Sequence, residues 1–231
     1  MTPVKVKPPI EEMLRNDTMT DKQWIAELHP DLRSYVYYPP VFGCIGISHP
    51  LEHDPGAGGM SPAVINWRYA AMQAQAAQAI KERDWSSYIF THSKPYRVGA
   101  FMDVMDDMTD REYWSELAAV WIGSENTHQN HWDWRRLFAS TRGEREYFMN
   151  AGEREFFAAL REKITIYRGH HRGNKVGWAW TLSEEKAKFF ANRLGARLKG
   201  GKIREITINK SDAIGYLNGR EEQEIVLARA R

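Results

Sequence analysis

The sequence is poor in cysteine, and Cys44 is the only residue of that type. No disulfide can form within the chain, and no cysteine-based zinc site or iron-sulfur centre can be built from it alone. Long apolar runs are also missing, and residues 1–12 contain prolines and lysines but no hydrophobic stretch like that of a secretory signal. We therefore expect a cytoplasmic protein that does not enter a membrane.

The chain also lacks an excess of charge of one sign. It contains 32 lysines and arginines and 30 aspartates and glutamates, which gives a formal net charge of +2. This mild basicity neither requires nor excludes a nucleic-acid partner. A hydrophobic content of 42% and a length of 231 residues are typical of a folded chain. The length allows one large domain or a helical part joined to a small catalytic part.

A glycine-rich stretch at residues 54–59 is not followed by Gly-Lys-Ser/Thr, so a phosphate-binding P-loop is not indicated. We expect residues 49–60 to form a flexible loop and residues 1–20 to form a loosely held arm, because prolines oppose a helix there. The apolar, tyrosine-rich residues 35–47 are broken by prolines and a glycine, which predicts short extended pieces.

Helical patterns dominate the chain up to residue 163. Pro62 after Ser61 predicts a helix that continues to about residue 83, and Thr109 with Glu112 forms the pattern of a capping box before a second amphipathic segment. Further helices are predicted at residues 96–108, 131–139 and 152–163.

The remainder alternates in the manner of strands. Residues 164–169 and 177–182 are predicted strands, and Ser183 is predicted to cap a helix that ends near Leu194 and Gly195. Residues 209–221 are expected to form a loop that leads into a last strand.

Two carboxylates mark the start of that last strand. Residues two apart on an extended strand project to the same face, so Glu222 and Glu224 are predicted to stand side by side. The alternative is a charged strand end with both carboxylates in water.

The ordered set of strand, capped helix and Glu-x-Glu strand resembles the ADP-ribosyltransferases of the arginine-serine-glutamate class, typified by cholera-like toxins. Its most specific parts are Tyr167-Arg168-Gly169 and Glu222-Gln223-Glu224-Ile225, supported by residues 180–187. One position departs from the family, since Ala179 falls where the first serine is expected, and only Thr181 keeps a hydroxyl.

The resemblance implies an α+β protein in which a mainly helical portion, residues 1–163, packs on a split β-sheet core, residues 164–231. The core is not expected to fold alone, and earlier segments should complete its sheet or cover the nucleotide. The implied co-substrate is NAD+, with no metal.

The resemblance also implies residue roles. Glu224 would stabilise the oxocarbenium-like transition state, and Glu222 would act as general base for the acceptor. The cofactor would be bound by Arg168, Gly169, His170, Trp180 and Thr181, with Thr181 orienting Glu224. Trp178 and Trp180 could either wall the nicotinamide pocket or belong to the core.

The acceptor is expected to be a macromolecule, either through a protein arginine or through an amino group of a nucleic-acid base. A basic cluster would suit a polyanion, although cations are also favoured after a helix end. Its members are Arg193, Arg197, Lys199, Lys202 and Arg204. The implied setting is an intracellular toxin or a phage factor acting on its host, with an antitoxin or inhibitor protein as a possible partner.

Other features of the middle of the chain have structural interpretations. Helical spacing favours core positions for Trp114, Trp121, Trp132 and Trp134 over a base-stacking platform beside arginines. The polar residues 124–126 are expected to end one helix and cap the next, and the histidines lack the spacing of a metal site.

Three other functions stay open: an NAD+ glycohydrolase, a catalytically inactive interaction module, and a helical nucleic-acid-binding protein.

Overall fold

The computed structural model describes residues 13–14, 18–41, 43–171, 173–193 and 201–231. The chain divides into two compact units, Met1–Asp106 and Asp107–Arg231. The division falls within the mainly helical region, whereas the predicted start of the catalytic core is residue 164. Most of the expected N-terminal arm lies outside the described residues, and Leu14 forms an isolated antiparallel bridge with Met60.

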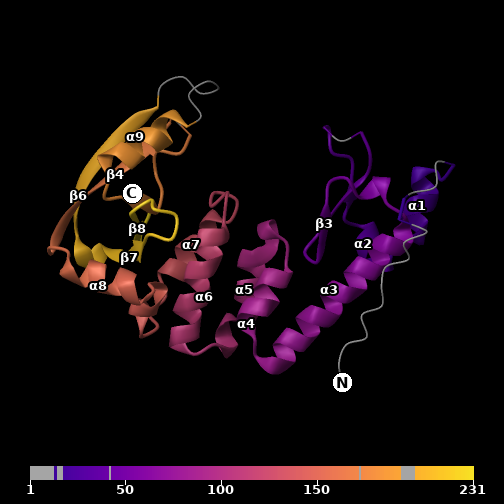
Figure 1. Cartoon of the computed structure of the whole chain (residues 1–231), viewed down its shortest axis with the longest axis horizontal. Helices are drawn as coiled ribbons and strands as arrows, with labels where there is room; N and C mark the ends of the chain where they lie inside the picture. The colour runs from indigo at the N-terminus through magenta and orange to yellow at the C-terminus, as the bar shows by residue number, and fades with distance from the viewer. Residues whose placement is uncertain (1–12, 15–17, 42, 172, 194–200) are drawn as a thin grey trace. The chain divides into compact units, whose positions relative to one another are not determined.

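The longest helix of the first unit is α3 (Pro62–Glu82), which Figure 1 shows in purple. It begins as the sequence predicts, because Ser61 Oγ accepts a hydrogen bond from the Val64 amide and Pro62 occupies the first turn. The unit also contains α1 (Asp21–Glu27), α2 (Pro30–Arg33), α4 (Trp85–Thr91), α5 (Arg97–Val104), β1 (Val36–Tyr37), β2 (Gly46–His49) and β3 (Glu52–Asp54).

The expectation of a flexible loop at residues 49–60 is wrong. Strands β2 and β3 form an antiparallel hairpin there, and the short 3-10 helix η2 (Ala57–Gly59) follows. Glu52 on β3 is buried, and its Oε1 lies 2.7 Å from Nη2 of Arg68 on α3. Burial raises the pKa of Glu52 to about 7, although the positive charge of Arg68 acts to lower it. Strand pairing and this buried ion pair are tertiary effects that glycine content does not reveal.

The second unit begins with helices. They are α6 (Asp110–Gly123), α7 (His131–Phe138), the 3-10 helix η5 (Arg145–Phe148) and α8 (Ala151–Ala159). The predicted capping box is confirmed, since Thr109 Oγ1 accepts from the Glu112 amide and Glu112 accepts from the Thr109 amide.

The prediction of core tryptophans in these helices is confirmed for three of four positions. Trp114, Trp121 and Trp134 are at most 3% exposed. Trp132 is 73% exposed, so its assignment to the core is wrong. Trp134 follows Trp132 by two positions on α7, and a helix turns about 200° over that spacing, so the two side chains point to different sides.

A five-stranded antiparallel sheet forms the C-terminal part of the second unit. Its strands, in the order β6-β4-β5-β8-β7, are β6 (Lys202–Asn209), β4 (Lys163–His170), β5 (Ala179–Thr181), β8 (Glu224–Leu227) and β7 (Ala213–Leu217). Tyr167 and Thr181 form the single residue pair between β4 and β5 in the described part of the chain. The sheet therefore consists of a two-stranded and a three-stranded part with a narrow join.

The described strands of this sheet all lie within residues 163–227, so of the two expected roles of earlier segments, completing the sheet is not found. The expectation of a loop before the last strand is wrong. Residues 209–221, expected to be a loop, contain β7, whose five residues are all buried. A short apolar run such as Ala213–Leu217 is ambiguous by periodicity, and its pairing with β8 decides its structure.

Helix α9 (Glu184–Asn192) packs against β4 and β6, as Figure 1 shows. The Ser183 hydroxyl accepts from the Lys186 amide, which confirms the predicted cap. The predicted helix end at Leu194 and Gly195 lies outside the described residues. The sheet core is formed by Ile164, Ile166, Trp180, Ile208, Ile225 and Leu227, with neighbouring apolar residues.

None of the helices in the described ranges combines the length and the apolar character that crossing a membrane requires.

Candidate active site

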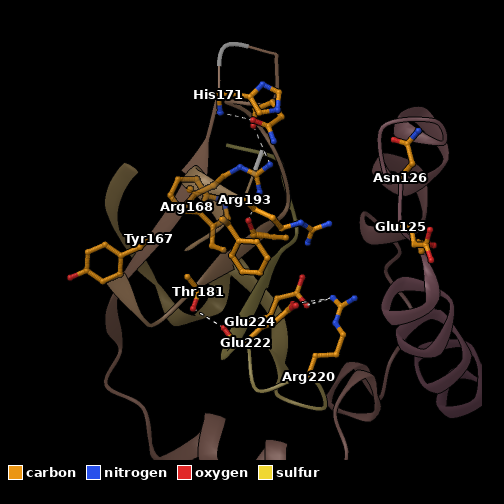
Figure 2. A pocket seen from close by; sticks show the side chains of 16 residues that line it. Glu125, Asn126, Tyr167, Arg168, His171, Thr181, Arg193, Arg220, Glu222 and Glu224 are labelled. Atoms are coloured by element: carbon orange, nitrogen blue, oxygen red, sulfur yellow. Dashed lines mark hydrogen bonds and ion pairs between the residues drawn. The ribbon is translucent and has the colours of Figure 1, made fainter. Parts of the chain in front are cut away.

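A cavity of about 590 Å³ lies in the second unit at the narrow join of the sheet. This volume is in the range of small-molecule sites. The four predicted catalytic residues, Arg168, Thr181, Glu222 and Glu224, all line it. Figure 2 shows them around one space although they come from three separate stretches of the chain. The structure thus brings the predicted set together.

The strand register explains how distant residues meet. Thr181 is the Cα partner of Tyr167 on one side and of Glu224 on the other. A single row of residues across the sheet therefore passes next to Arg168 and through Thr181 and Glu224. The cavity opens where this row crosses the join.

Glu224 is buried, with a hydrogen-bond donor at one oxygen and a guanidinium near the other. Trp121 Nε1 on α6 donates to Oε1 over 3.0 Å, and Arg220 Nη2 lies 3.7 Å from Oε2. Burial raises the pKa of Glu224 from 4.5 to about 7, and the charge of Glu222 acts in the same direction. The Trp121 hydrogen bond and the charges of Arg220 and Arg168 oppose that rise. Glu224 can therefore change its charge near neutral pH.

Glu222 lines the cavity, but it does not belong to the strand on which it was predicted. Strand β8 begins at Glu224, and Gln223 has a left-handed backbone with φ of 48°. The two carboxylates are therefore not neighbours on one extended strand, and the predicted geometry is wrong. They share the cavity because the turn bends, and Arg220 Nη2 lies 3.1 Å from Glu222 Oε2.

Several hydrogen bonds hold the turn before β8 in place. The Asn218 amide donates to buried Glu153 on α8 over 2.7 Å, and the Asn218 side chain accepts from the Gln223 amide over 3.1 Å. Two residues of the turn, Glu221 and Gln223, have positive φ without being glycine. Such residues cost roughly 1–2 kcal/mol each, so the surrounding contacts must hold the turn in this form.

Thr181 positions this turn, and its hydroxyl does not bond to the Glu224 carboxylate that it was predicted to orient. Its hydroxyl donates to the backbone carbonyl of Glu222 over 2.7 Å and accepts from the Ser183 amide over 3.0 Å. One hydroxyl therefore links the turn to the start of α9.

Arg168 is engaged with backbone carbonyls. Its Nη1 donates to the Ala179 carbonyl and its Nη2 donates to the Asn174 carbonyl over 3.2 Å. Burial lowers its pKa, and the charge of Glu224 opposes this. Two of its five N–H donors are therefore used within the protein, and the guanidinium joins β4 to β5 and to the preceding loop.

Gly169 is required by helix packing. A Cβ at this position would collide with the backbone of α9, at the Ala187 carbonyl and the Ala191 amide. This contact accounts for the glycine without the close cofactor approach that the sequence suggested.

His170 is buried and does not line the cavity, whereas its neighbour His171 does.

The two tryptophans differ in their surroundings. Trp178 packs against His131 and Phe138, with ring centroids 4.8 and 6.1 Å away. Trp180 belongs to the sheet core, as one interpretation predicted, and it also lines the cavity.

The polar tract after α6 has a role beyond capping. Ser124 ends the helix through its amide, which donates to the Trp121 carbonyl over 3.1 Å, as expected. Ser124, Glu125 and Asn126 also line the cavity, and Figure 2 shows Glu125 and Asn126 across from Arg168 and Thr181. No local pattern relates this tract to Arg168 and Thr181, which follow it by more than 40 positions.

Arg193 is a third arginine at the cavity, beside Arg168 and Arg220. Within the part of the chain that the structure describes, no side-chain hydrogen bond or ion pair is found for it. Of the predicted basic cluster, Arg197 and Lys199 lie outside the described residues, and Arg204 stacks on the Trp180 ring at 5.5 Å.

Sequence reasoning missed Trp121 and Arg220 as site residues. Trp121 has the spacing of a core residue, and its indole N–H is specified by the tertiary structure. In the described ranges, no group of three or more histidine, cysteine, aspartate or glutamate side chains is arranged to hold a metal ion.

Comparison with protein-family models, curated proteins and solved structures finds no match.

Proposed function

We propose that the second unit is a mono-ADP-ribosyltransferase of the arginine-serine-glutamate class, which moves ADP-ribose from NAD+ onto a nitrogen of a macromolecule. The observation that carries the proposal is the single cavity that contains Arg168, Thr181, Glu222 and a buried Glu224. The antiparallel sheet with its one-pair join, at which this cavity lies, supports the predicted split-sheet core.

The chemistry suits a buried carboxylate. Cleavage of the bond between nicotinamide and ribose C1′ develops positive charge on the ribose, as in glycoside cleavage. An ionised Glu224 would stabilise that charge strongly because its carboxylate is buried. Trp121 and Arg220 hold its two oxygens in place and favour the ionised form.

Glu222 is suited to act on the acceptor. It lies closer to the surface than Glu224, with 26% of its side chain exposed against 8%. It can therefore accept the proton that an incoming nitrogen loses. The guanidinium that already lies against it favours an arginine acceptor over a nucleic-acid base.

Arg193 is the residue suited to the diphosphate of NAD+. Arg168 donates to two carbonyls and Arg220 pairs with carboxylates, so Arg193 is left to balance the negative charge of the cofactor. Arg193→Ala should weaken NAD+ binding at least about tenfold, and Arg193→Lys should restore part of the affinity. Titration calorimetry with NAD+ measures both.

The expected setting is an enzyme that acts inside a cell, as a toxin or a phage factor, and that a partner protein could inhibit. This part of the proposal rests on the resemblance alone.

The acceptor is identified by incubating the protein with cell extract and NAD+ labelled in its adenylate phosphate. Parallel samples are treated with protease, RNase or DNase. The proposal predicts label that protease removes on proteins of the extract, separated by size from the enzyme itself, and label removed only by a nuclease would identify a nucleic acid. Free ADP-ribose without macromolecular label would replace the transferase by an NAD+ glycohydrolase, and unchanged NAD+ would indicate a non-catalytic module.

A further inference from the structure

Arg220 is a guanidinium held against both carboxylates of the candidate site, as Figure 2 shows. Its Nη2 lies 3.1 Å from Glu222 Oε2 and 3.7 Å from Glu224 Oε2. Its Nη1 donates to the Ile122 carbonyl over 3.3 Å. The side chain lines the cavity and is 46% exposed. One of its nitrogens is thus beside the proposed general base, on a side chain that lines the cavity proposed for NAD+.

The other two arginines of the cavity differ from it. Arg168 is largely buried, and both of its terminal nitrogens donate to backbone carbonyls. Arg193 lines the cavity but is not paired with a carboxylate in the described residues. Arg220 alone among the three combines exposure to the cavity with a carboxylate at hydrogen-bonding distance from a terminal nitrogen.

We propose that Arg220 is a site of self-modification, at which the enzyme attaches ADP-ribose from NAD+ to its own chain. This inference rests on the proposed function and names one acceptor for it. An acceptor in the same chain needs no binding step, so its effective concentration at the site is high.

The reaction is a substitution at ribose C1′. The bond from C1′ to the nicotinamide nitrogen breaks, and its electron pair leaves with nicotinamide. Nη2 of Arg220 donates an electron pair to C1′, and its proton passes to the Glu222 carboxylate and then to water. No oxidant or reductant is needed.

Self-modification would also lower the rate of NAD+ turnover by the enzyme. ADP-ribose on Arg220 would remain in the cavity and would break the ion pairs with Glu222 and Glu224. NAD+ turnover should therefore slow as the modified fraction rises.

The test incubates the pure full-length protein with NAD+ and no other macromolecule, and measures nicotinamide release together with intact mass. We expect one added ADP-ribose, located on Arg220 by peptide fragmentation, at a rate independent of protein concentration. Arg220→Lys should lose this addition. Arg135→Lys, an exposed arginine on α7, should keep it, and incubation with ADP-ribose in place of NAD+ should give none.

The outcomes separate this inference from the proposed function. Nicotinamide release with no modification, or with modification at other residues that Arg220→Lys leaves unchanged, overturns self-modification at Arg220 and leaves the enzyme proposal standing. If neither nicotinamide release nor label transfer is found, both self-modification at Arg220 and the proposed enzyme function are overturned. Thermal unfolding of each variant shows whether it is folded, and Arg220→Gln provides a second variant without a guanidinium.

Discussion

Glu224→Gln should stabilise the protein at alkaline pH while removing its activity. Burial raises the pKa of Glu224 from 4.5 to about 7, which corresponds to about 3 kcal/mol against the ionised form in the folded protein. That pKa already includes the favourable charges of Arg220 and Arg168. Glutamine has nearly the same shape and keeps an oxygen for the Trp121 indole, but it has no charge to bury.

The direction of this pH effect follows from the linkage between protonation of Glu224 and folding. Because folding raises the pKa, the stability that protonated Glu224 provides is complete below pH 4.5 and is lost as the pH rises through about 7. Glutamine does not titrate, so the variant avoids this loss. Above pH 8 its free energy of unfolding should exceed that of the wild type by up to about 3 kcal/mol, and its Tm should be higher by roughly 6–12 °C. The difference should vanish near pH 4.5.

The assay is urea unfolding of both proteins at several pH values from about 4.5 to 9. Glu52→Gln is the matched control, because Glu52 is also a buried acid with a pKa raised to about 7 but lies in the first unit. It should reduce the same pH dependence and keep NAD+ cleavage. A Glu224→Gln difference that is constant with pH, or that is negative above pH 8, would refute the reasoning about burial.

Three further substitutions test the roles of individual site residues. Glu222→Ala should lower transfer about 10²–10⁴-fold but NAD+ hydrolysis much less, because water needs less help from a base, and equal losses would assign it to cofactor binding. Arg168→Lys should lower both the Tm and NAD+ affinity, because lysine cannot serve the two carbonyls, and unchanged melting and calorimetry would make Arg168 dispensable. Trp121→Phe should raise the pKa of Glu224 further, so that the pH-activity profile moves to higher pH and activity recovers in alkaline buffer. A loss of activity equal at every pH would instead indicate general damage to the site.

Local signals in the sequence predicted much of the secondary structure. The caps at Ser61, Thr109 and Ser183 act over three residues, and each forms the expected hydrogen bond. The strand at Lys163–His170 followed from alternation alone. Strand β7 was missed because a short run of buried residues has no period that separates it from a loop leading into the next strand.

The candidate site was predicted in its residues but not in its geometry. The resemblance to the arginine-serine-glutamate class, which the order of the segments along the chain carries, implied that Arg168, Thr181 and the two glutamates lie together. The left-handed Gln223, which moves Glu222 off the strand, depends on contacts with Asn218 and Thr181 that no local pattern encodes. Likewise, the indole of Trp121 lies 103 positions before the carboxylate that it binds.

The most direct measurement of the central claim is nicotinamide release from NAD+ by the pure protein, compared with Glu224→Gln and with Glu52→Gln. We expect release by the wild type and by Glu52→Gln, with a rate that rises as the pH passes through about 7 and Glu224 ionises. We also expect a loss of about 10²–10³-fold in Glu224→Gln. A loss smaller than about tenfold, which is about 1.4 kcal/mol, would contradict the central role of Glu224.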